Sequence, residues 1–514
     1  MSRARASRAW SGASDSGEDA SAPPRAATKA WARDKSMGDT RESMAPPPEN
    51  RSGRFNRRGR QCFPSGPSSK EATWTRGVAT AVRLLRARAG VAYGPRLAHG
   101  PRIAGMAASV VEVNVESIGS GPGDAVHSSW LELSASALRH NVAVFRALEG
   151  QGAPRALGVV LKGNAYGHGL AQVLPVVHGE VDLLYVIAPQ DALKVREYER
   201  AQGLGPRQVL VLGAVAPDEA VVLAREGVDA VVADRGWADA AAVLRAAKLE
   251  RPLRVHVHLD TGLGREGFTL EGLPTESRFL SESRDVLEVV GVLSHFANTE
   301  DVTEQGYALA QVDAFEKGLA FLSEQLAPAR PLQRHIAASA ATLVLPRARY
   351  EALRVGISLY GLWPSPETRL SARLVLGEVP VLKPVLSWRC RSQVVKWLSA
   401  GSYVGYGCTY RCPEPTRIAV LPVGYYDGYP RLVSGKAHVL VNGRRCPVLG
   451  RVMMNHLIVD VTRATSDERP VTATLMGRDG EESVPAESLA GWAQTIHYEL
   501  VTRLGAHLKR TVVA

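Results

Sequence analysis

The segment VVLKGNAYGHG, residues 159–169, places a lysine where an apolar run stops. Lys162 is followed by small polar residues, a tyrosine and a histidine that stands between two glycines. A lysine amine can attack a carbonyl group or act as a base when it is partly withdrawn from water. Lysine side chains are otherwise mostly exposed, so the same position can mark the point where a strand reaches the surface. The segment alone leaves both interpretations open.

Other polar residues follow apolar runs in the same way. Arg265 comes after such a run in LDTGLGREG, and His295 ends one in LSHFA. Ser339 ends RHIAAS, and Arg354 lies in LRVGIS. Each of them alone is most simply a surface charge, a structural histidine or a turn residue. Their common position at the ends of apolar runs nevertheless indicates that the fold gathers them at one place.

A regular alternation of short apolar runs and amphipathic stretches, which begins at residue 128, positions these side chains. The stretches 189–202 and 217–227 have the apolar spacing and the end residues of helices. Eight strands are predicted at 157–162, 183–188, 208–213, 229–234, 254–260, 289–296, 334–339 and 353–358. This alternation predicts an α/β fold, a TIM-like (β/α)8 barrel, whose chemistry lies at the carboxyl ends of its strands. Lys162 ends the first strand and is expected to point into the barrel mouth.

The pattern changes at residue 365 to short apolar runs separated by Gly, Pro and Asn-Gly. Runs such as 416–424 and 437–452 predict a compact, mostly β domain. The sequence therefore divides into a disordered basic extension at 1–125, a barrel at 126–364 and a C-terminal β-domain at 365–514.

The extension carries the net charge of the chain, which is +11. Residues 1–105 contain 20 Lys and Arg against 8 Asp and Glu, whereas the remaining residues contain 42 against 43. The predicted domains are almost neutral, and neither nucleic acid nor a membrane is expected as a partner. The extension is rich in Ser, Pro, Gly and Arg and has little apolar periodicity, which predicts disorder. A basic targeting or nucleic-acid arm and a natural start at Met106 are the alternatives.

The five cysteines are few, odd in number and without the spacing of a disulfide framework. This usage indicates a reducing compartment, and a cytoplasmic protein is expected. Cys408 and Cys412 are close in sequence, but no second Cys or His pair accompanies them at the spacing of a zinc site. No metal site is therefore expected.

Seven motifs of this sequence carry a resemblance to a known family. The motifs are VVLKGNAYGHG, LDTGLGREG, LSHFANTED, LRVGISLYGLWPSP, VGYGCTY, LPVGYYDGYPR and GRVMMNHLIVD. In order and spacing they resemble the motifs of the alanine racemase family, pyridoxal-phosphate enzymes built from a barrel and a β-domain. The resemblance runs from about Ser128 to the C-terminus. It implies an isomerase that interconverts L-alanine and D-alanine and supplies D-alanine for peptidoglycan.

The resemblance implies a role for each of the residues singled out above. Lys162 would bind pyridoxal 5'-phosphate covalently and act as one base, and Tyr406 of the partner subunit in a homodimer would act as the second. Arg265 and the backbone N–H of Met454, also from the partner subunit, would bind the carboxylate of the amino-acid substrate. Arg354 would face the ring nitrogen of the cofactor. The other cofactor-binding residues would be His295 beside that arginine and, around the phosphate, Tyr166, Ser339, Gly356, Ile357 and Tyr498.

Three positions depart from the pattern of the family. His258 stands where many members have a lysine, often carbamylated, that steadies the substrate-binding arginine. Arg265 must then be held in another way, for example by a bound anion. Ala338 and Asn455 stand where asparagine and aspartate are common. A racemase of serine or of broader amino-acid specificity is therefore the alternative to strict alanine preference.

Two other classes of protein share parts of this pattern. A non-catalytic pyridoxal-phosphate carrier would share the lysine segment but would need neither a β-domain nor Tyr406. A barrel decarboxylase typically uses a cysteine from its second domain and a glycine-rich phosphate loop, and neither occurs in the corresponding motifs. Racemisation is the interpretation that uses all the motifs.

Overall fold

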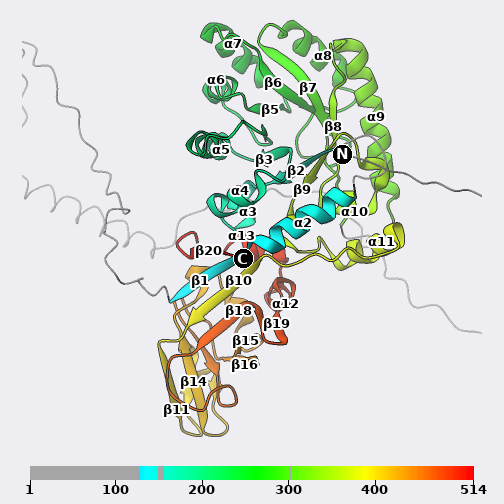
Figure 1. Cartoon of the computed structure of the whole chain (residues 1–514). Coiled ribbons are helices and arrows are strands. Elements are labelled where there is room, and N and C mark those ends of the chain that lie inside the picture. The colour runs from blue at the N-terminus through cyan, green and yellow to red at the C-terminus, as the bar shows by residue number, and fades with distance from the viewer. Residues whose placement is uncertain (1–127, 149–154, 301–302) are drawn as a thin grey trace, which may run out of the picture. The chain divides into compact units, whose positions relative to one another are not determined.

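The computed structural model describes residues 128–148, 155–300 and 303–514, which belong to one compact unit. The predicted extension at 1–125 lies outside the described residues, so its disorder stays a prediction. The described part contains an eight-stranded parallel sheet and a second, mostly antiparallel sheet (Figure 1). Within these ranges no helix is long and apolar enough to cross a lipid bilayer.

Eight parallel strands form the first sheet, and each overlaps one predicted strand. They are β2 (Ala156–Val160), β3 (Leu183–Val186), β4 (Gln208–Val211), β5 (Asp229–Val232), β6 (Leu253–His258), β7 (Leu287–Leu293), β8 (Gln333–His335) and β9 (Ala352–Val355). Their order is β8-β7-β6-β5-β4-β3-β2-β9. The two ends of this order meet at a bridge between Ala338 and Arg354, where the Arg354 N–H donates to Ala337 O at 3.0 Å. The predicted (β/α)8 barrel is confirmed.

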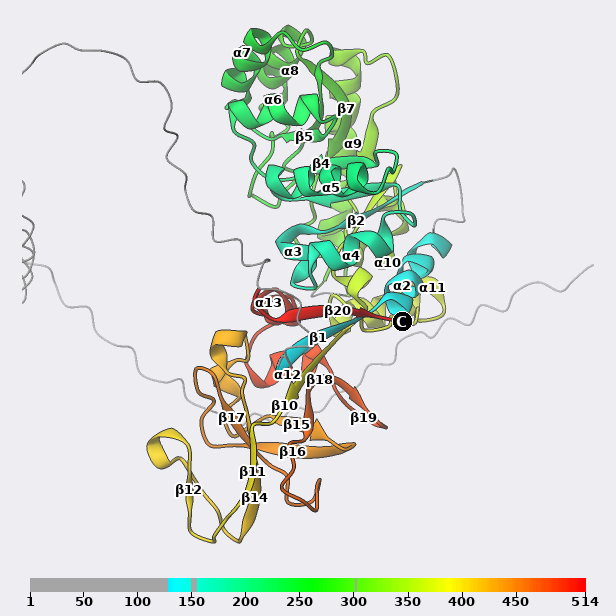
Figure 2. The same ribbon diagram turned by 60° about the vertical axis from the view of Figure 1, so that its left-hand side comes forward.

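Helices alternate with these strands, and the longer ones lie outside the barrel (Figures 1 and 2). They are α3 (Lys162–Tyr166), α4 (Leu170–Val177), α5 (Pro189–Ala201), α6 (Pro217–Arg225), α7 (Trp237–Ala247), α8 (Leu273–Glu282), α9 (Gly306–Leu326) and α10 (Ser339–Val344). Proline stands in the first turn of α5, α6 and α8, where its missing N–H costs no helical hydrogen bond. α2 (Ala135–Ala147) and α11 (Pro366–Leu376) each follow a serine whose Oγ accepts from a first-turn N–H.

The second sheet has the strand order β11-β14-β17-β16-β15-β18-β10-β1-β20, with β19 beside β18. Its strands are β1 (Ser129–Ser134), β10 (Leu386–Arg391), β11 (Val394–Leu398), β14 (Thr416–Leu421), β15 (His438–Val441), β16 (Arg444–Leu449), β17 (Leu457–Asp460), β18 (Thr472–Asp479), β19 (Glu482–Val484) and β20 (Lys509–Val513). β15 and β16 are joined by Asn442 and Gly443, with φ of 50° and 70°, which is the hairpin turn that Asn-Gly favours. The predicted mostly β domain is confirmed.

β1 belongs to the second sheet, although the sequence prediction assigned it to the barrel range of 126–364. It pairs antiparallel with β10 and parallel with β20. Its alternate residues Leu131 and Leu133 are buried, which shows only that one face of the strand packs on a core. The strands of the second sheet resume at Leu386, after α11. The predicted domain boundary between residues 364 and 365 stays a prediction.

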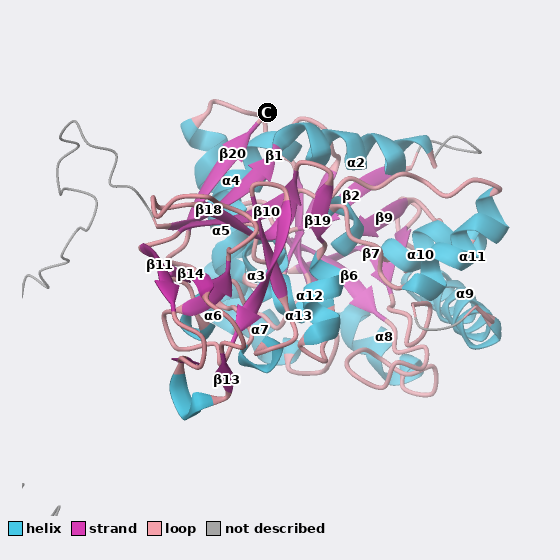
Figure 3. Cartoon of the chain, turned by 90° about the horizontal axis from the view of Figure 1, so that it is seen from below, coloured by secondary structure: helices cyan, strands magenta, loops and turns pink. Residues whose placement is uncertain are grey.

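Two features of the C-terminal part bear on the site. A short ladder of β12 (Tyr403–Val404) and β13 (Tyr410–Arg411) carries a helical turn at Tyr406–Cys408 and projects from the second sheet (Figures 2 and 3). α12 (Ala486–Trp492) and α13 (His497–Thr502) follow β19, and α13 packs against α3. This packing brings Tyr498 to the barrel mouth.

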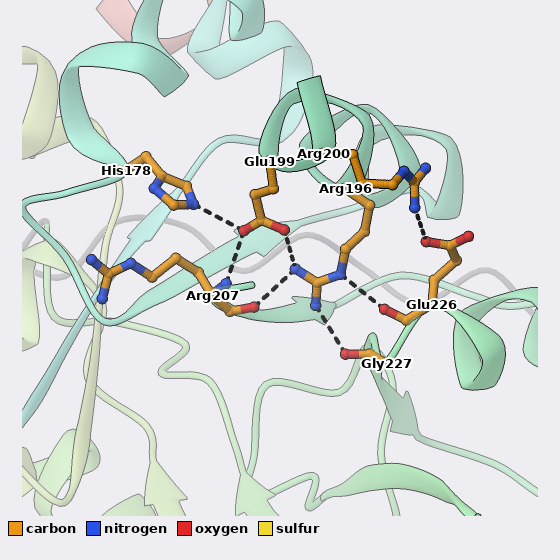
Figure 4. A network of polar contacts seen from close by, with 7 residues as sticks. All are labelled: His178, Arg196, Glu199, Arg200, Arg207, Glu226 and Gly227. Atoms are coloured by element: carbon orange, nitrogen blue, oxygen red, sulfur yellow. Dashed lines mark hydrogen bonds and ion pairs between the residues drawn. The ribbon is translucent and has the colours of Figure 1, made fainter. Parts of the chain in front are cut away.

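A buried polar network stabilises the end of the barrel opposite to the mouth (Figure 4). Glu199 on α5 accepts hydrogen bonds from His178 Nε2 at 2.9 Å, from Arg196 Nη1 at 2.7 Å and from the Arg207 N–H at 2.8 Å. Arg196 also donates to three loop carbonyl groups, those of Arg207, Glu226 and Gly227. Burial alone would raise the pKa of Glu199, but these three hydrogen bonds hold it below its ordinary value. The network thereby joins α4 and α5 to the loops that lead into β4 and β5.

Candidate active site

Lys162 lies at the carboxyl edge of the barrel, where β2 has already ended at Val160. The prediction that Lys162 is the last residue of this strand is therefore wrong by two positions. The reason is a tight turn, since residues 163–166 have φ between 52° and 62°, in the left-handed region. The first of the four is glycine and the second is asparagine, which tolerates this conformation, whereas Ala165 and Tyr166 each cost roughly 1–2 kcal/mol in it. Hydrogen bonds of 2.9 Å from the N–H groups of Gly167 and Gly169 to carbonyl groups of the turn stabilise it.

Lys162 lines a cavity of about 950 Å³ at the barrel mouth. Burial lowers the pKa of the Lys162 amine below its ordinary value, and the positive charges of Arg265 and Arg354 lower it further. Glu266 and Glu300 act in the opposite direction. A lowered pKa leaves more of the amine neutral, which is the form that attacks a carbonyl group or accepts a proton.

Arg354 on β9 is buried, lines the same cavity and is fixed by five contacts. Its Nη1 donates to His335 Nδ1 at 2.9 Å and to His335 O at 2.5 Å. Its Nη2 donates to Ser294 O at 2.7 Å and to Ile336 O at 3.1 Å, and lies 3.2 Å from His295 Nδ1. Burial lowers the pKa of Arg354 to about 10, which still leaves the side chain cationic near neutral pH.

His295 follows β7 and is the neutral partner of the cationic Arg354. Burial and the charge of Arg354 hold the pKa of His295 well below its ordinary value. Because a guanidinium group can only donate, His295 Nδ1 accepts and the ring proton is assigned to Nε2. His295 therefore offers a hydrogen-bond donor at the cavity that it lines.

Hydroxyl groups and backbone N–H groups converge at the ends of β8 and β9. Ser339 Oγ accepts from the Gly356 N–H at 2.9 Å and from the Ser358 N–H at 3.4 Å. A Cβ at Gly356 would lie 2.6 Å from Tyr166 Oη, so glycine is required for the hydroxyl group to approach the backbone. Ser358 Oγ is buried and has no hydrogen-bond partner within the described residues. Tyr166, Ser339 and the backbone of Gly356 and Ile357 line the cavity at this place, and their donors fit a phosphate group.

Tyr498 of α13 lines the cavity and donates to the Glu300 carboxylate, with Oη–Oε distances of 3.1 and 3.0 Å. The sequence prediction named Tyr498 but missed Glu300, which stands inside the motif LSHFANTED. An acidic residue in the loop that follows β7 at the barrel mouth was the available signal. A phosphate bound here would compete with Glu300 for the tyrosine hydroxyl, because both groups accept hydrogen bonds.

Arg265, in the loop after β6, is paired with its neighbour in the sequence. Its Nε and Nη2 donate to Glu266 Oε2 and Oε1, both at 2.6 Å. His258 Nδ1 lies 3.8 Å from Glu266 Oε1, and burial lowers the pKa of His258 to about 4, so that the ring is neutral near pH 7. The hypothesis of a bound anion is not needed, since the chain itself supplies the carboxylate that holds Arg265. The sequence prediction missed this role of Glu266.

Nine of the eleven predicted site residues line the cavity at the barrel mouth. They are Lys162, Tyr166, Arg265, His295, Ser339, Arg354, Gly356, Ile357 and Tyr498. Tyr406 and Met454 line a second cavity of about 510 Å³, together with Arg451 and Asn455. Tyr406 is 71% exposed and Met454 is 54% exposed. Among the described residues of one chain, the first cavity is therefore lined by no tyrosine other than Tyr166 and Tyr498.

Comparison with known proteins gives the family. The model of the alanine racemase N-terminal domain matches residues 133–364, and that of the C-terminal domain matches residues 385–512. The alanine racemase of Leptospira interrogans is 36% identical over 390 residues, which cover 75% of this chain and 96% of that protein. The chain belongs to the alanine racemase family. The alanine racemase of Symbiobacterium thermophilum is likewise 36% identical, over 75% of this chain and 97% of that protein.

Solved alanine racemase structures share the fold. Alanine racemase from Streptomyces coelicolor A3(2) aligns with a TM-score of 0.68 at 32% identity, over 76% of this chain and 99% of that one. Alanine racemase from Bacillus anthracis with bound L-Ala-P aligns with a TM-score of 0.66 at 30% identity, over 75% of this chain and 95% of that one. As a member of the alanine racemase family, this chain is an isomerase, an amino-acid racemase.

Proposed function

We propose that the protein interconverts L-alanine and D-alanine with pyridoxal 5'-phosphate as cofactor, by proton transfer on both faces of the substrate. The observation that carries this proposal is the shared cavity of Lys162, Arg265 and Arg354, in which the pKa of the lysine amine is lowered. When bound, pyridoxal phosphate withdraws electrons from the amino-acid α-carbon, so that its proton becomes removable. Lys162 would hold the cofactor aldehyde and act as the base on one face.

The other cavity residues would bind the cofactor. Tyr166, Ser339 and Tyr498, with the backbone N–H groups of residues 356 and 357, would hold the phosphate. Arg354 would face the ring nitrogen. Because its guanidinium group is cationic and only donates, it disfavours a proton on that nitrogen. We therefore expect few side reactions such as transamination and a strong dependence on well-placed bases.

Racemisation requires a second base on the opposite face of the α-carbon. We assign this role to Tyr406, delivered by the partner subunit of a homodimer with composite sites. The assignment is supported by the exposure of Tyr406 on a projecting ladder, away from the cavity of Lys162 in its own chain. His295 and the charge of Arg354 would favour the deprotonated tyrosine. An isologous two-fold dimer then builds two equivalent sites.

The substrate carboxylate would be bound by Arg265 and by the backbone N–H of Met454 of the partner subunit. A guanidinium group suits a planar carboxylate, and Glu266 holds that of Arg265 in place. Ala338 and Asn455 line the two cavities and differ from the residues common in the family. A preference for serine, or for a broader set of amino acids, is the second candidate function.

The proposed biological role is the supply of D-alanine for peptidoglycan in the cytoplasm. The four cysteines in the described part of the chain are free thiols, which fits a reducing compartment. A non-catalytic carrier would leave Tyr406 and the β-domain without a role. A decarboxylase is not favoured, because none of the described residues that line the cavity of Lys162 is a cysteine.

Incubation of the purified, cofactor-loaded protein with a panel of L-amino acids tests the proposal. We expect D-alanine to form faster than any other D-isomer, as followed by chiral chromatography, and no D-isomer to form with Lys162→Ala. Faster formation of D-serine would establish the second candidate function. Absence of every D-isomer would refute racemisation.

A further inference from the structure

A row of buried polar groups crosses the barrel interior next to Arg354. His335 Nε2 lies 2.8 Å from His256 Nδ1, and His256 Nε2 lies 3.5 Å from Asp229 Oδ2. Both histidines are fully buried, and Asp229 is 3% exposed. Together with the 2.9 Å contact between Arg354 Nη1 and His335 Nδ1, the row runs from the barrel mouth to the first residue of β5.

The hydrogen-bonding capacity of these groups gives the row one direction. Arg354 only donates, so His335 Nδ1 accepts. Burial and the charge of Arg354 hold the pKa of His335 well below its ordinary value, so the ring is neutral and carries its proton on Nε2. This N–H donates to His256 Nδ1. The proton of His256 then lies on Nε2, which faces Asp229 Oδ2 at 3.5 Å and has no hydrogen-bond partner within the described residues.

The carboxylate of the row belongs to Asp229, which Arg354 does not contact directly. Within the described ranges Arg354 is bonded to carbonyl groups and imidazole nitrogens but to no carboxylate. Asp229 is itself held by Gln208 Nε2 at 2.8 Å and by Arg254 Nε at 3.1 Å. Because a neutral imidazole has one donor and one acceptor, the cation at one end of the row and the anion at the other favour the same proton position in both rings.

Gly291, which has no side chain, leaves room for the His256 ring in the barrel interior. A Cβ at Gly291 on β7 would lie 2.2 Å from His256 Nδ1, so any larger residue there would displace the ring. The interiors of such barrels are otherwise filled by branched apolar side chains. A buried polar row is costly unless its members satisfy one another. The glycine and the row therefore act as one structural unit.

We propose that His256 and Asp229 are positioning residues for Arg354, on which they act through His335. This inference rests on the proposed function, in which Arg354 faces the cofactor ring nitrogen. The negative charge of Asp229 favours in both imidazole rings the proton positions that Arg354 requires, so that His335 presents a lone pair to Arg354 Nη1. The plane of the guanidinium group is then fixed, and its Nη2 stays bonded to His295.

Two substitutions of His256 separate hydrogen bonding from packing. His256 accepts from His335 and faces Asp229 across 3.5 Å without a hydrogen bond. A glutamine amide can likewise accept from His335 and present its N–H group to Asp229, whereas leucine can do neither. We expect His256→Leu to lower kcat roughly 10- to 100-fold, since displacement of a group near the reacting atoms has effects of this size. The KM for alanine should change less than about threefold, because Arg265 lies outside the row. His256→Gln should stay within about threefold of the wild type in both constants.

NMR spectra of 15N-labelled histidine rings in the cofactor-loaded protein give a readout that is independent of activity. We expect the His335 proton on Nε2 in the wild type and in His256→Gln, and exchange between the two ring nitrogens in His256→Leu. His178→Leu is the matched control, because it removes a buried imidazole from the Glu199 network, which does not contact Arg354. This control should retain the His335 proton position and kcat.

A proton on Nδ1 of His335 in the wild type, or on both of its nitrogens, would overturn the inference. So would a wild-type kcat in His256→Leu, or equal losses of kcat in His256→Leu and His256→Gln. If His256→Leu does not fold, the wild-type spectrum and the activity of His256→Gln decide. A wild-type protein that forms no D-alanine contradicts the proposed function, whereas a wrong proton position contradicts only this inference.

Discussion

Arg265 and Glu266, neighbours in the sequence, bind each other through two hydrogen bonds of 2.6 Å at the barrel mouth. The pair uses Nε and Nη2 of the guanidinium group, which leaves Nη1 available to a second carboxylate. His258 lies close to the same carboxylate, with 3.8 Å between its Nδ1 and Glu266 Oε1. Glu266 thus holds the guanidinium group of Arg265 in one orientation at the cavity.

We predict that Glu266→Gln raises the KM for alanine about two- to fivefold, as expected for an ion pair that is partly exposed and contributes roughly 0.2–1 kcal/mol. The loss of its negative charge should also lower the pKa of Lys162 further, because Glu266 raises that pKa. Steady-state kinetics measure the first effect. Glu271→Gln, at an exposed glutamate outside the cavity, is the control. A KM equal to that of the control would argue against a role of Glu266.

We predict that Gly356→Ala weakens binding of pyridoxal phosphate at least about tenfold, or roughly 1.4 kcal/mol. The new Cβ would lie 2.6 Å from Tyr166 Oη and would push this hydroxyl group away from the backbone donors. Fluorescence titration of the cofactor-free protein measures the affinity. Gly179→Ala is the matched control, since no atom lies within 4 Å of a Cβ built there. Equal affinities of the two variants would exclude this site for the phosphate.

We predict that Glu199→Gln destabilises the protein by about 3 kcal/mol at neutral pH, because it leaves Arg196 buried without its carboxylate. Urea unfolding measures the change, and Glu197→Gln, at an exposed position of the same helix, is the control. The folded-state pKa of Glu199 is lowered, so its contribution is present above the ordinary value of about 4.3 and is lost as pH falls through the folded-state pKa. The difference between wild type and variant should therefore shrink in acid. A difference that does not depend on pH would contradict the ionised state.

Periodicity was sufficient to predict the strands of the barrel, because each is a short, mostly apolar or buried run between helices, as in β3 and β5. It could not place β1, whose alternation fits either sheet and whose partners β10 and β20 lie more than 250 residues away in the sequence. The end of β2 was predicted two residues too late, at Lys162, because the sequence KGNAY did not indicate the left-handed turn that follows the strand. The row from Arg354 to Asp229 joins four different strands or strand ends. Only the closed barrel brings these residues together.

We predict that two inactive variants restore activity when their subunits mix. Lys162→Ala lacks one base and Tyr406→Phe the other, so a hybrid dimer has one site with both bases intact. About half of the dimers are hybrids after random mixing, which gives roughly a quarter of full activity. Racemisation assays after subunit exchange measure the recovery. No recovery from subunits that are shown to exchange would place both bases in one chain.

The exchange of the α-hydrogen with deuterated solvent in Tyr406→Phe tests the two-base account most directly. If Tyr406 removes the proton of L-alanine and Lys162 that of D-alanine, the variant should lose racemisation in both directions. It should still exchange the α-hydrogen of D-alanine, because Lys162 is intact, and should exchange that of L-alanine far more slowly. Mass spectrometry of each enantiomer measures both rates. Equal deuterium incorporation into the two enantiomers, or unchanged racemisation, would contradict the account.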